Sequence, residues 1–192
     1  MEQFAPGAVL LNASDILRRA HLDIGMTVGD FGCGGSGLFT LKAAKMVGDH
    51  GKVFAVDILK SALSSVMSKA RFNGFTNILT IWSNLELYGA TRAIRDGTVD
   101  FGIVVNTLHQ TKRPEIALKE INRMISRNGR ILVVDWMTGR ASFGPTEKDL
   151  IMPDKVRAIA KALGLQEEAS FEAGPYHYGL ILTKQPSVAG KE

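Results

Sequence analysis

The residues best suited to binding a ligand lie in a glycine-rich turn between residues 27 and 37. The order of residue types predicts the end of a strand, a turn on glycine, and a helix that begins near Leu38. Gly32, Gly34 and Gly37 would let the backbone pass close to a ligand, and the free N–H groups of the following helix would suit an electron-rich group. The spacing matches the G-x-G-x-x-G pattern of dinucleotide-binding turns, but a glycine-rich turn without a ligand can have it too.

A carboxylate at the mouth of this turn bears on the kind of ligand. Asp30 stands two residues before Gly32, at the end of the predicted strand. It would repel a pyrophosphate and attract a ligand with an ammonium group and a sulfonium. These are the charges of S-adenosylmethionine, so Asp30 favours that cofactor over a dinucleotide.

A second carboxylate ends the next predicted strand, residues 52–57. Asp57 follows Gly37 by 20 residues, where a strand-end acid would accept hydrogen bonds from both ribose hydroxyls of a nucleoside. S-adenosylmethionine and NAD would both use it in this way. The alternative is an ordinary strand-end acid that caps the following helix. In the nucleoside interpretation, Ile58 lies against the adenine.

A histidine follows the fourth predicted strand, residues 99–105. If the strand order reverses there, the segment from Asn106 to His109 lies at the carboxyl edge of the sheet beside the glycine turn. The backbone carbonyl of Asn106 could then accept from the ammonium group of a cofactor. His109 could act as a general base, because imidazole titrates near neutrality. The alternative is a solvent-exposed histidine at the start of the next helix.

The stretch from Asp30 to Gly34 resembles the first motif of the class I S-adenosylmethionine-dependent methyltransferases, an acid, any residue, then G-x-G-x-G. One departure is Ser36, which occupies the slot of the third glycine, as though the turn were one residue longer. The resemblance covers most of the chain and implies an S-adenosylmethionine site, with Asn84 at the adenine edge unless it is a plain turn asparagine. The implied cofactor-binding residues are Asp30, Gly32, Cys33, Gly34, Gly37, Asp57, Ile58, Asn84, Leu85 and Asn106.

The elements that must hold these residues alternate between strand and helix, which predicts an α/β protein. Two extended runs near the carboxyl end, 166–173 and 177–183, predict a hairpin. With the resemblance, they imply a Rossmann-like methyltransferase fold: a doubly wound seven-stranded sheet, parallel with one antiparallel strand in the C-terminal hairpin, and helices on both faces. The other predicted strands are 26–30, 77–82 and 130–135, and the predicted helices are 8–20, 38–47, 59–70, 114–125 and 154–163.

Length and composition predict a single domain over residues 1–192, because 45% hydrophobic and 22% charged residues suit one full-sized core. Residues 1–25 would form an N-terminal helix or lid, 26–184 the core and 185–192 a frayed tail. No stretch predicts a membrane span or a signal peptide. One cysteine excludes an intrachain disulfide and predicts a cytoplasmic location. Four scattered histidines predict no metal site, and no motif predicts covalent catalysis.

A net charge of +4 could indicate RNA, but the basic residues are scattered and suit solvated helix faces. The apolar segment 136–152 could line an acceptor pocket or cover the edge of the sheet. The resemblance implies in-line methyl transfer to a small-molecule acceptor, as in methyltransferases of the quinone-biosynthesis type; one cysteine disfavours an arsenite acceptor. The alternatives are an RNA or protein methyltransferase, a non-catalytic nucleoside-binding module and an NAD(P)-dependent oxidoreductase. The oligomeric state is not indicated.

Overall fold

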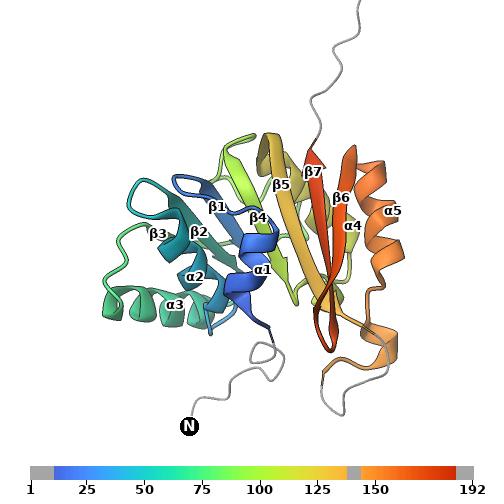
Figure 1. The fold of residues 1–192 in the computed structure, drawn as a ribbon, viewed down its shortest axis with the longest axis horizontal. Helices are drawn as coiled ribbons and strands as arrows, with labels where there is room; N and C mark the ends of the chain where they lie inside the picture. Colours follow the sequence, from blue (N-terminus) through green and yellow to red (C-terminus); the bar gives the residue numbers. More distant parts are fainter. Residues whose placement is uncertain (1–10, 138–143, 185–192) are drawn as a thin grey trace, which may run out of the picture.

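The computed structural model describes residues 11–137 and 144–184, whose strands form one seven-stranded sheet (Figure 1). The strand order is β3-β2-β1-β4-β5-β7-β6. β7 is antiparallel to both of its neighbours, while the other adjacent pairs are parallel. This confirms the predicted sheet with one antiparallel strand. The strands are β1 (Thr27–Phe31), β2 (Lys52–Asp57), β3 (Ile78–Trp82), β4 (Val99–Val105), β5 (Ile125–Trp136), β6 (Leu165–Gly174) and β7 (His177–Lys184).

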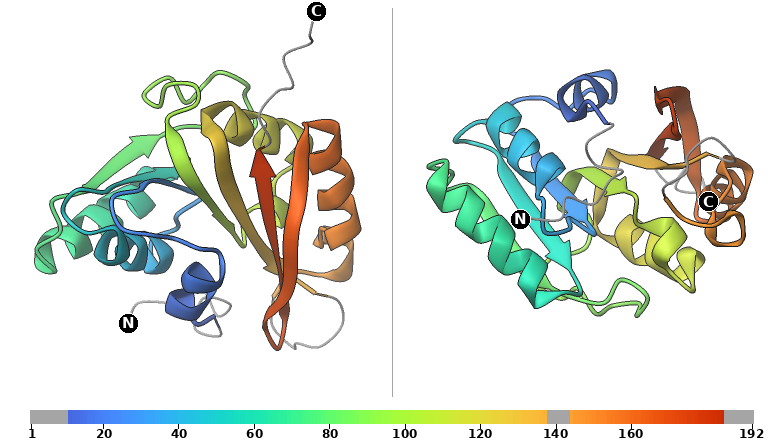
Figure 2. Two further views of the ribbon diagram at one scale, coloured as in Figure 1. Left: turned by 45° about the horizontal axis from the view of Figure 1, so that its top comes forward. Right: turned by 90° about the horizontal axis from the view of Figure 1, so that it is seen from below.

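Helices cover both faces of the sheet, as predicted (Figures 1 and 2). Three helices belong to the core on one face, and two belong to the core on the other. β2 is buried on both sides, which explains why its sequence is an apolar run without alternation. The first group is α1 (Ala13–Arg19), α2 (Leu38–Val47) and α3 (Lys60–Phe72); the second is α4 (Pro114–Met124) and α5 (Pro153–Ala162). The short 3-10 helices are η2 (Leu108–Gln110) and η3 (Glu147–Asp149).

The predicted boundary between α4 and β5 was wrong. Sequence periodicity placed Ile125 in the helix and began the strand at residue 130, whereas α4 ends at Met124 and β5 begins at Ile125. The reason lies on another strand: Ile125 pairs with Val99, and the N–H of Thr98 donates to the carbonyl of Met124 at 3.0 Å. The helix therefore ends where residues 98–99, which are distant in the sequence, form backbone hydrogen bonds and strand pairing with residues 124–125.

The N-terminal helix is also shorter than predicted. It begins at Ala13 because Asn12 caps it, its side chain accepting from the N–H of Asp15 at 3.2 Å, and it ends at Arg19. Residues 8–10 of the predicted helix and the predicted tail 185–192 lie outside the described residues. The buried side chains of Ala13, Ile16 and Leu17 place α1 in the same core as α2.

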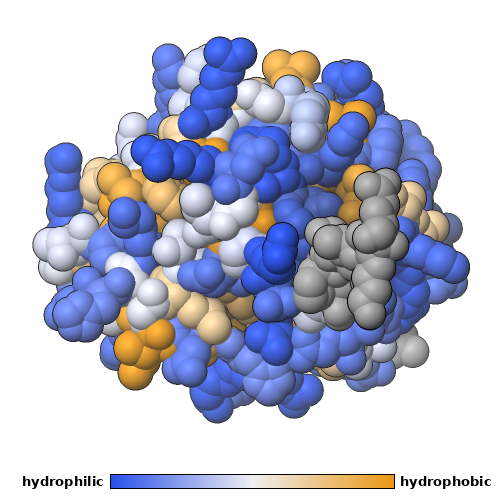
Figure 3. Space-filling view, turned by 90° about the horizontal axis from the view of Figure 1, so that it is seen from above, coloured by the Kyte–Doolittle hydropathy of each residue, from blue (hydrophilic) through white to orange (hydrophobic). Residues whose placement is uncertain are grey.

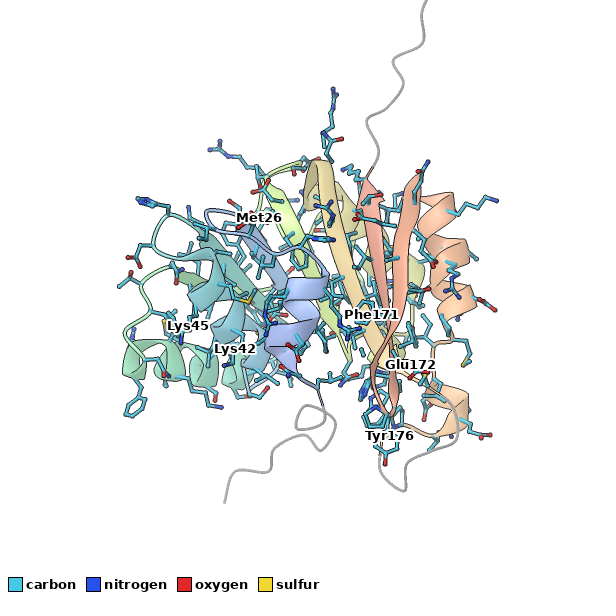
Figure 4. The ribbon with its side chains drawn as sticks, viewed as in Figure 1. Met26, Lys42, Lys45, Phe171, Glu172 and Tyr176 are labelled. Atoms are coloured by element: carbon cyan, nitrogen blue, oxygen red, sulfur yellow. The ribbon has the colours of Figure 1, made fainter. Side chains whose placement is uncertain are left out.

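The parallel strands end at one edge of the sheet, the lower edge in Figure 1 and the one seen from below in Figure 2. β1 and β4 are neighbours there, and their connections lead to opposite sides, so a crevice forms between them. The hairpin turn, with Tyr176, lies at this edge (Figure 4). The opposite edge is mostly hydrophilic with separate small apolar areas (Figure 3). No helix in the described part of the chain is long and apolar enough to cross a membrane.

Candidate active site

Two adjoining cavities occupy the crevice at the carboxyl edge. The first, about 300 Å³, is lined by polar side chains that include Asp30, Asn106 and His109. The second, about 260 Å³, is lined by the residues predicted for the nucleoside: Asp57, Ile58, Asn84 and Leu85. Both share Gly32, Gly34, Asn106 and Gln110. The structure thus brings together every predicted site residue except Gly37.

Gly37 serves packing and not the cavity. It precedes α2 with a φ of +59°, and a Cβ added there would lie 3.0 Å from Val66 of α3. A glycine is required at this position by its left-handed backbone and by the close approach of α3. The third glycine of the pattern therefore has a structural explanation that needs no ligand.

The backbone N–H groups of the glycine turn are directed at β2. Gly32 and Cys33 donate to the carbonyl of Val56, at 2.8 and 3.1 Å, and Gly34 donates to Asp57 Oδ2 at 2.9 Å. These donors are used within the protein. Gly34 has a φ of +61°, and no atom of the described residues lies within 4 Å of where a Cβ would be, so the backbone presents an open surface to the cavities there.

The extra residue of the turn is anchored by α3. The carbonyl of Gly35 accepts from Ser65 Oγ and Lys69 Nζ, both at 2.9 Å, and Lys69 also reaches the carbonyl of Ser36 at 3.4 Å. The departure from the usual motif at Ser36 is thus held by hydrogen bonds from the next helix. Sequence spacing gave no sign of this anchor.

Asp30 lines the first cavity and is only 2% exposed. Its Oδ2 accepts from Thr40 Oγ1 of α2 at 2.5 Å. Burial raises the pKa of Asp30 from 3.8 to about 7; the Thr40 hydrogen bonds oppose this shift, and the charge of Asp57 adds to it. A positively charged ligand in the cavity would favour the ionised carboxylate.

Asp57 is held by two backbone donors. Its Oδ2 accepts from Gly34 and its Oδ1 from the N–H of Leu59, each at 2.9 Å. The contact with Leu59 does not cap the following helix, because α3 (Lys60–Phe72) has Leu59 as its N-cap residue and no side-chain capping hydrogen bond. Asp57 also lines the second cavity. Each carboxylate oxygen keeps a further lone pair for a hydroxyl. Ile58 beside it is 54% exposed, which leaves its side chain available to cover a flat ring.

Asn84 shows the turn role that was its alternative. Its Oδ1 accepts from the N–H of Glu86 at 2.9 Å, and its carbonyl accepts from Leu87 at 3.2 Å. Asn84 still lines the second cavity beside Leu85, which is 8% exposed and forms an apolar wall. Oδ1 keeps a second lone pair, so the side chain of Asn84 could still accept from a ligand as well as donate to one.

The atom of Asn106 predicted to bind the cofactor, its backbone carbonyl, already has a partner within the protein. This carbonyl accepts from Gln110 Nε2 at 2.6 Å, whereas the buried Oδ1 of Asn106 has no hydrogen-bond partner among the described residues. A φ of +53° sets this backbone apart from the preceding strand. Asn106 lines both cavities, so its side-chain oxygen is a candidate acceptor for an ammonium group.

His109 is not an exposed helix start. It lies in η2, before α4 begins at Pro114, and its side chain is 10% exposed. Its Nδ1 lies 2.7 Å from Asp135 Oδ1, and its backbone N–H donates to Asp135 Oδ2 at 3.2 Å. The prediction from sequence missed Asp135. It is an acid at a strand end, the same signal that identified Asp57.

Apolar side chains form the outer wall of the first cavity: Leu11, Phe39, Trp136 and Pro145. Trp136 ends β5 and contacts the ring of His177, with ring centroids 4.3 Å apart. Of the segment 136–152, Trp136 and Pro145 line the first cavity, while Ile151 is buried in the core. That this cavity holds the acceptor stays a prediction. Phe143 lies outside the described residues.

Cys33 lines the first cavity as a thiol. Burial, with the charges of Asp30 and Asp57, raises its pKa well above the ordinary range, which does not suit a thiolate nucleophile. Within residues 11–137 and 144–184, no three side chains of histidine, cysteine, aspartate or glutamate come together as metal ligands would.

A family profile and a curated relative agree on one class of enzyme. A family profile described as a methyltransferase domain matches residues 22–174. The ubiquinone/menaquinone biosynthesis C-methyltransferase UbiE of Escherichia fergusonii is 33% identical over 113 residues, which are 58% of this chain and 43% of that protein. The chain thus spans less than half the length of this curated relative.

Solved structures share the fold. A SAM-dependent methyltransferase from Aquifex aeolicus is 24% identical, with a TM-score of 0.82 over 95% of this chain and 100% of that one. An arsenic(III) S-adenosylmethionine methyltransferase from Chlamydomonas reinhardtii is 20% identical, with a TM-score of 0.67 over 88% of this chain and 66% of that one. At these identities the likeness shows the fold and leaves the acceptor open.

Proposed function

The chain belongs to the methyltransferase domain family, and on that premise we propose that it transfers the methyl group of S-adenosylmethionine to a small hydroxyarene. One observation carries the proposal: two cavities meet at the glycine turn, one beside a ribose-type carboxylate and the other beside a buried acid and a histidine. A nucleoside joined to an amino acid needs such a pair of connected compartments.

The residues fit this cofactor. Asp57 and Ile58 would hold its nucleoside, while Asp30 and Asn106 Oδ1, which has no partner in residues 11–137 and 144–184, would hold its ammonium end. Gly34 leaves room where the two halves join. When bound, the cofactor supplies an electrophilic methyl group on a sulfonium. The chain contributes alignment and a cavity with apolar walls, and positioning alone can supply on the order of 7–11 kcal/mol.

His109 is proposed as the base that takes a proton from the acceptor, because its ring lines the first cavity. The curated relative is described as a quinone-biosynthesis C-methyltransferase, and the apolar wall formed with Trp136 suits a flat ring. We therefore propose a quinol-like acceptor. The comparisons give no support to an oxidoreductase, an RNA or protein methyltransferase, or a non-catalytic module. The single cysteine supports the proposed cytoplasmic location.

Thermal unfolding with S-adenosylhomocysteine and with NADH tests the cofactor. S-adenosylhomocysteine at 100 times its dissociation constant is expected to add about 2.7 kcal/mol to the free energy of unfolding, and NADH to add nothing. Incubation of the protein with S-adenosylmethionine and reduced naphthalene-1,4-diol is expected to give a methylated product by mass spectrometry. Stabilisation by NADH alone, or failure of S-adenosylhomocysteine to stabilise, would contradict the proposal.

Gly34→Ala is expected to weaken S-adenosylhomocysteine binding by at least tenfold, because its Cβ would project into the space shared by the cavities. The left-handed backbone should also cost about 1–2 kcal/mol of stability. Gly74→Ala is the matched control, since Gly74 has a φ of +74°, open space around it and no place in either cavity. Isothermal titration of both variants separates the two effects, and equal affinities would show that Gly34 does not face the ligand.

A further inference from the structure

We infer that Asp135 is a positioning residue: its carboxylate holds the Nδ1–H of His109 and so leaves Nε2 as a proton acceptor in the wall of the first cavity. The inference rests on the proposed function and adds to it a fixed tautomer and a requirement on the acceptor. The acceptor must carry a hydroxyl proton that His109 can remove.

The contacts of Asp135 define the orientation of His109. Asp135 lies near the end of β5 and is 1% exposed. Its Oδ1 is 2.7 Å from His109 Nδ1 and accepts from the N–H of Trp136 at 2.9 Å, while its Oδ2 accepts from the N–H of His109 at 3.2 Å. One carboxylate thus binds both the backbone and the ring of the same residue. An ionised carboxylate can only accept, so the ring nitrogen that faces it must carry the proton.

No other charged group of the described residues competes for this carboxylate. The one basic side chain there within ion-pair distance of Asp135 is His109. On the neighbouring strand, His177 and Tyr178 lie opposite Trp136 and Asp135. Both are held neutral, because burial lowers the pKa of His177 to about 4 and raises that of Tyr178 above its usual range. The Tyr178 hydroxyl donates to the carbonyl of Ile151, at 2.9 Å. Across the cavity, Asp30 is bound to Thr40.

The contact between His109 and Asp135 defines where the acceptor proton goes during methyl transfer. The acceptor gives its hydroxyl proton to His109 Nε2, and the electron pair freed on oxygen moves into the ring, so that a ring carbon forms the bond to the methyl carbon. The ketone formed in this way becomes a hydroxyarene again when the proton on that ring carbon moves to the oxygen. The pair of the broken carbon–sulfur bond stays on sulfur, which becomes a neutral thioether. His109 is then a cation beside the Asp135 carboxylate until its proton passes to water. The carboxylate therefore stabilises the charge that the transfer creates.

The tautomer can be measured without an acceptor. In protein labelled with ¹⁵N-histidine and saturated with S-adenosylhomocysteine, long-range ¹H–¹⁵N spectra at pH 8 are expected to show His109 protonated on Nδ1. In Asp135→Asn the new amide can donate to Nδ1, so the proton is expected on Nε2. Asp100→Asn is the matched control: Asp100 accepts from the Thr27 N–H at 2.9 Å and lines neither cavity. An Nε2–H signal in the wild type, or no change in Asp135→Asn, would overturn the inference.

Transfer assays test the consequence. Asp135→Asn is expected to lower kcat for naphthalene-1,4-diol by about 10²–10⁴-fold, with the affinity for S-adenosylhomocysteine unchanged. The 1,4-dimethoxy derivative, which has no hydroxyl proton, is expected to give no product. Methylation of that derivative, or full activity of the variant, would overturn the inference. Loss of S-adenosylhomocysteine binding by the wild type would instead contradict the proposed function, so the two failures are distinguishable.

Discussion

Replacing His109 by glutamine is expected to lower kcat for methyl transfer by about 10²–10⁴-fold, the range that a positioned general base contributes. Glutamine can still donate from its amide to Asp135, which lies 2.7 Å from His109 Nδ1 in the wild type. It cannot accept a proton near neutrality. The measurement is the rate of product formation with naphthalene-1,4-diol at saturating S-adenosylmethionine.

The control for this variant is His50→Gln, because His50 is exposed in the turn after α2 and lines neither cavity. It is expected to keep the wild-type rate. Both variants should bind S-adenosylhomocysteine as the wild type does, since the His109 change alters proton acceptance and not the nucleoside cavity. A His109→Gln protein with wild-type kcat would show that the acceptor reacts without this base.

Local patterns in the sequence were sufficient to locate a candidate site residue where the pattern and the residue belong to the same strand or turn. The glycine turn after β1, the acid that ends β2 and the histidine after β4 could be located because each lies at the end of a short apolar strand or just beyond it. The sheet order then brings the ends of β1, β2 and β4 together, as the resemblance to methyltransferases implies. Apart from the N-terminal helix and the α4–β5 boundary, predicted element ends lie within two residues of those observed.

Partners that come from other elements could not be read from these patterns. Thr40 reaches Asp30 from the first turn of α2, and Lys69 reaches the carbonyl of Gly35 from α3. Neither residue type is unusual for a helix surface. Their roles depend on how closely each helix packs on the glycine turn, which hydrophobic periodicity does not specify.

Asp135 could be predicted from the sequence only together with the order of the strands. The parallel register of β4 and β5 pairs Val105 with Val134, so Asn106 and Asp135 come next on adjacent strands and His109 lies just beyond. Once the strand order is known, an acid at the end of β5 should lie close to the segment after β4. The strand-end rule applied to Asp57 would have identified Asp135 as well, had it been applied to every strand.

The affinity for S-adenosylmethionine is expected to fall about tenfold for each pH unit between pH 7 and pH 5, through the titration of Asp30. Burial raises the pKa of this carboxyl from 3.8 to about 7 in the free protein. A bound cation requires the ionised form, so binding below pH 7 must release a proton. The ligand ammonium keeps its own proton in this range. Isothermal titration at pH 6 in two buffers of different ionisation enthalpy should detect the release.

Asp30→Asn is expected to move stability and affinity in opposite directions. A raised pKa means that Asp30 stabilises the fold fully only below about pH 4, and that this contribution, on the order of 4 kcal/mol, is lost as the pH rises through 7. A neutral asparagine should therefore make the free protein more stable at pH 8, while weakening S-adenosylmethionine binding and removing its dependence on pH. Asp100→Asn, outside both cavities, should change neither. An affinity that is flat from pH 5 to 7 in the wild type would show that Asp30 serves only to hold Thr40 and the start of α2.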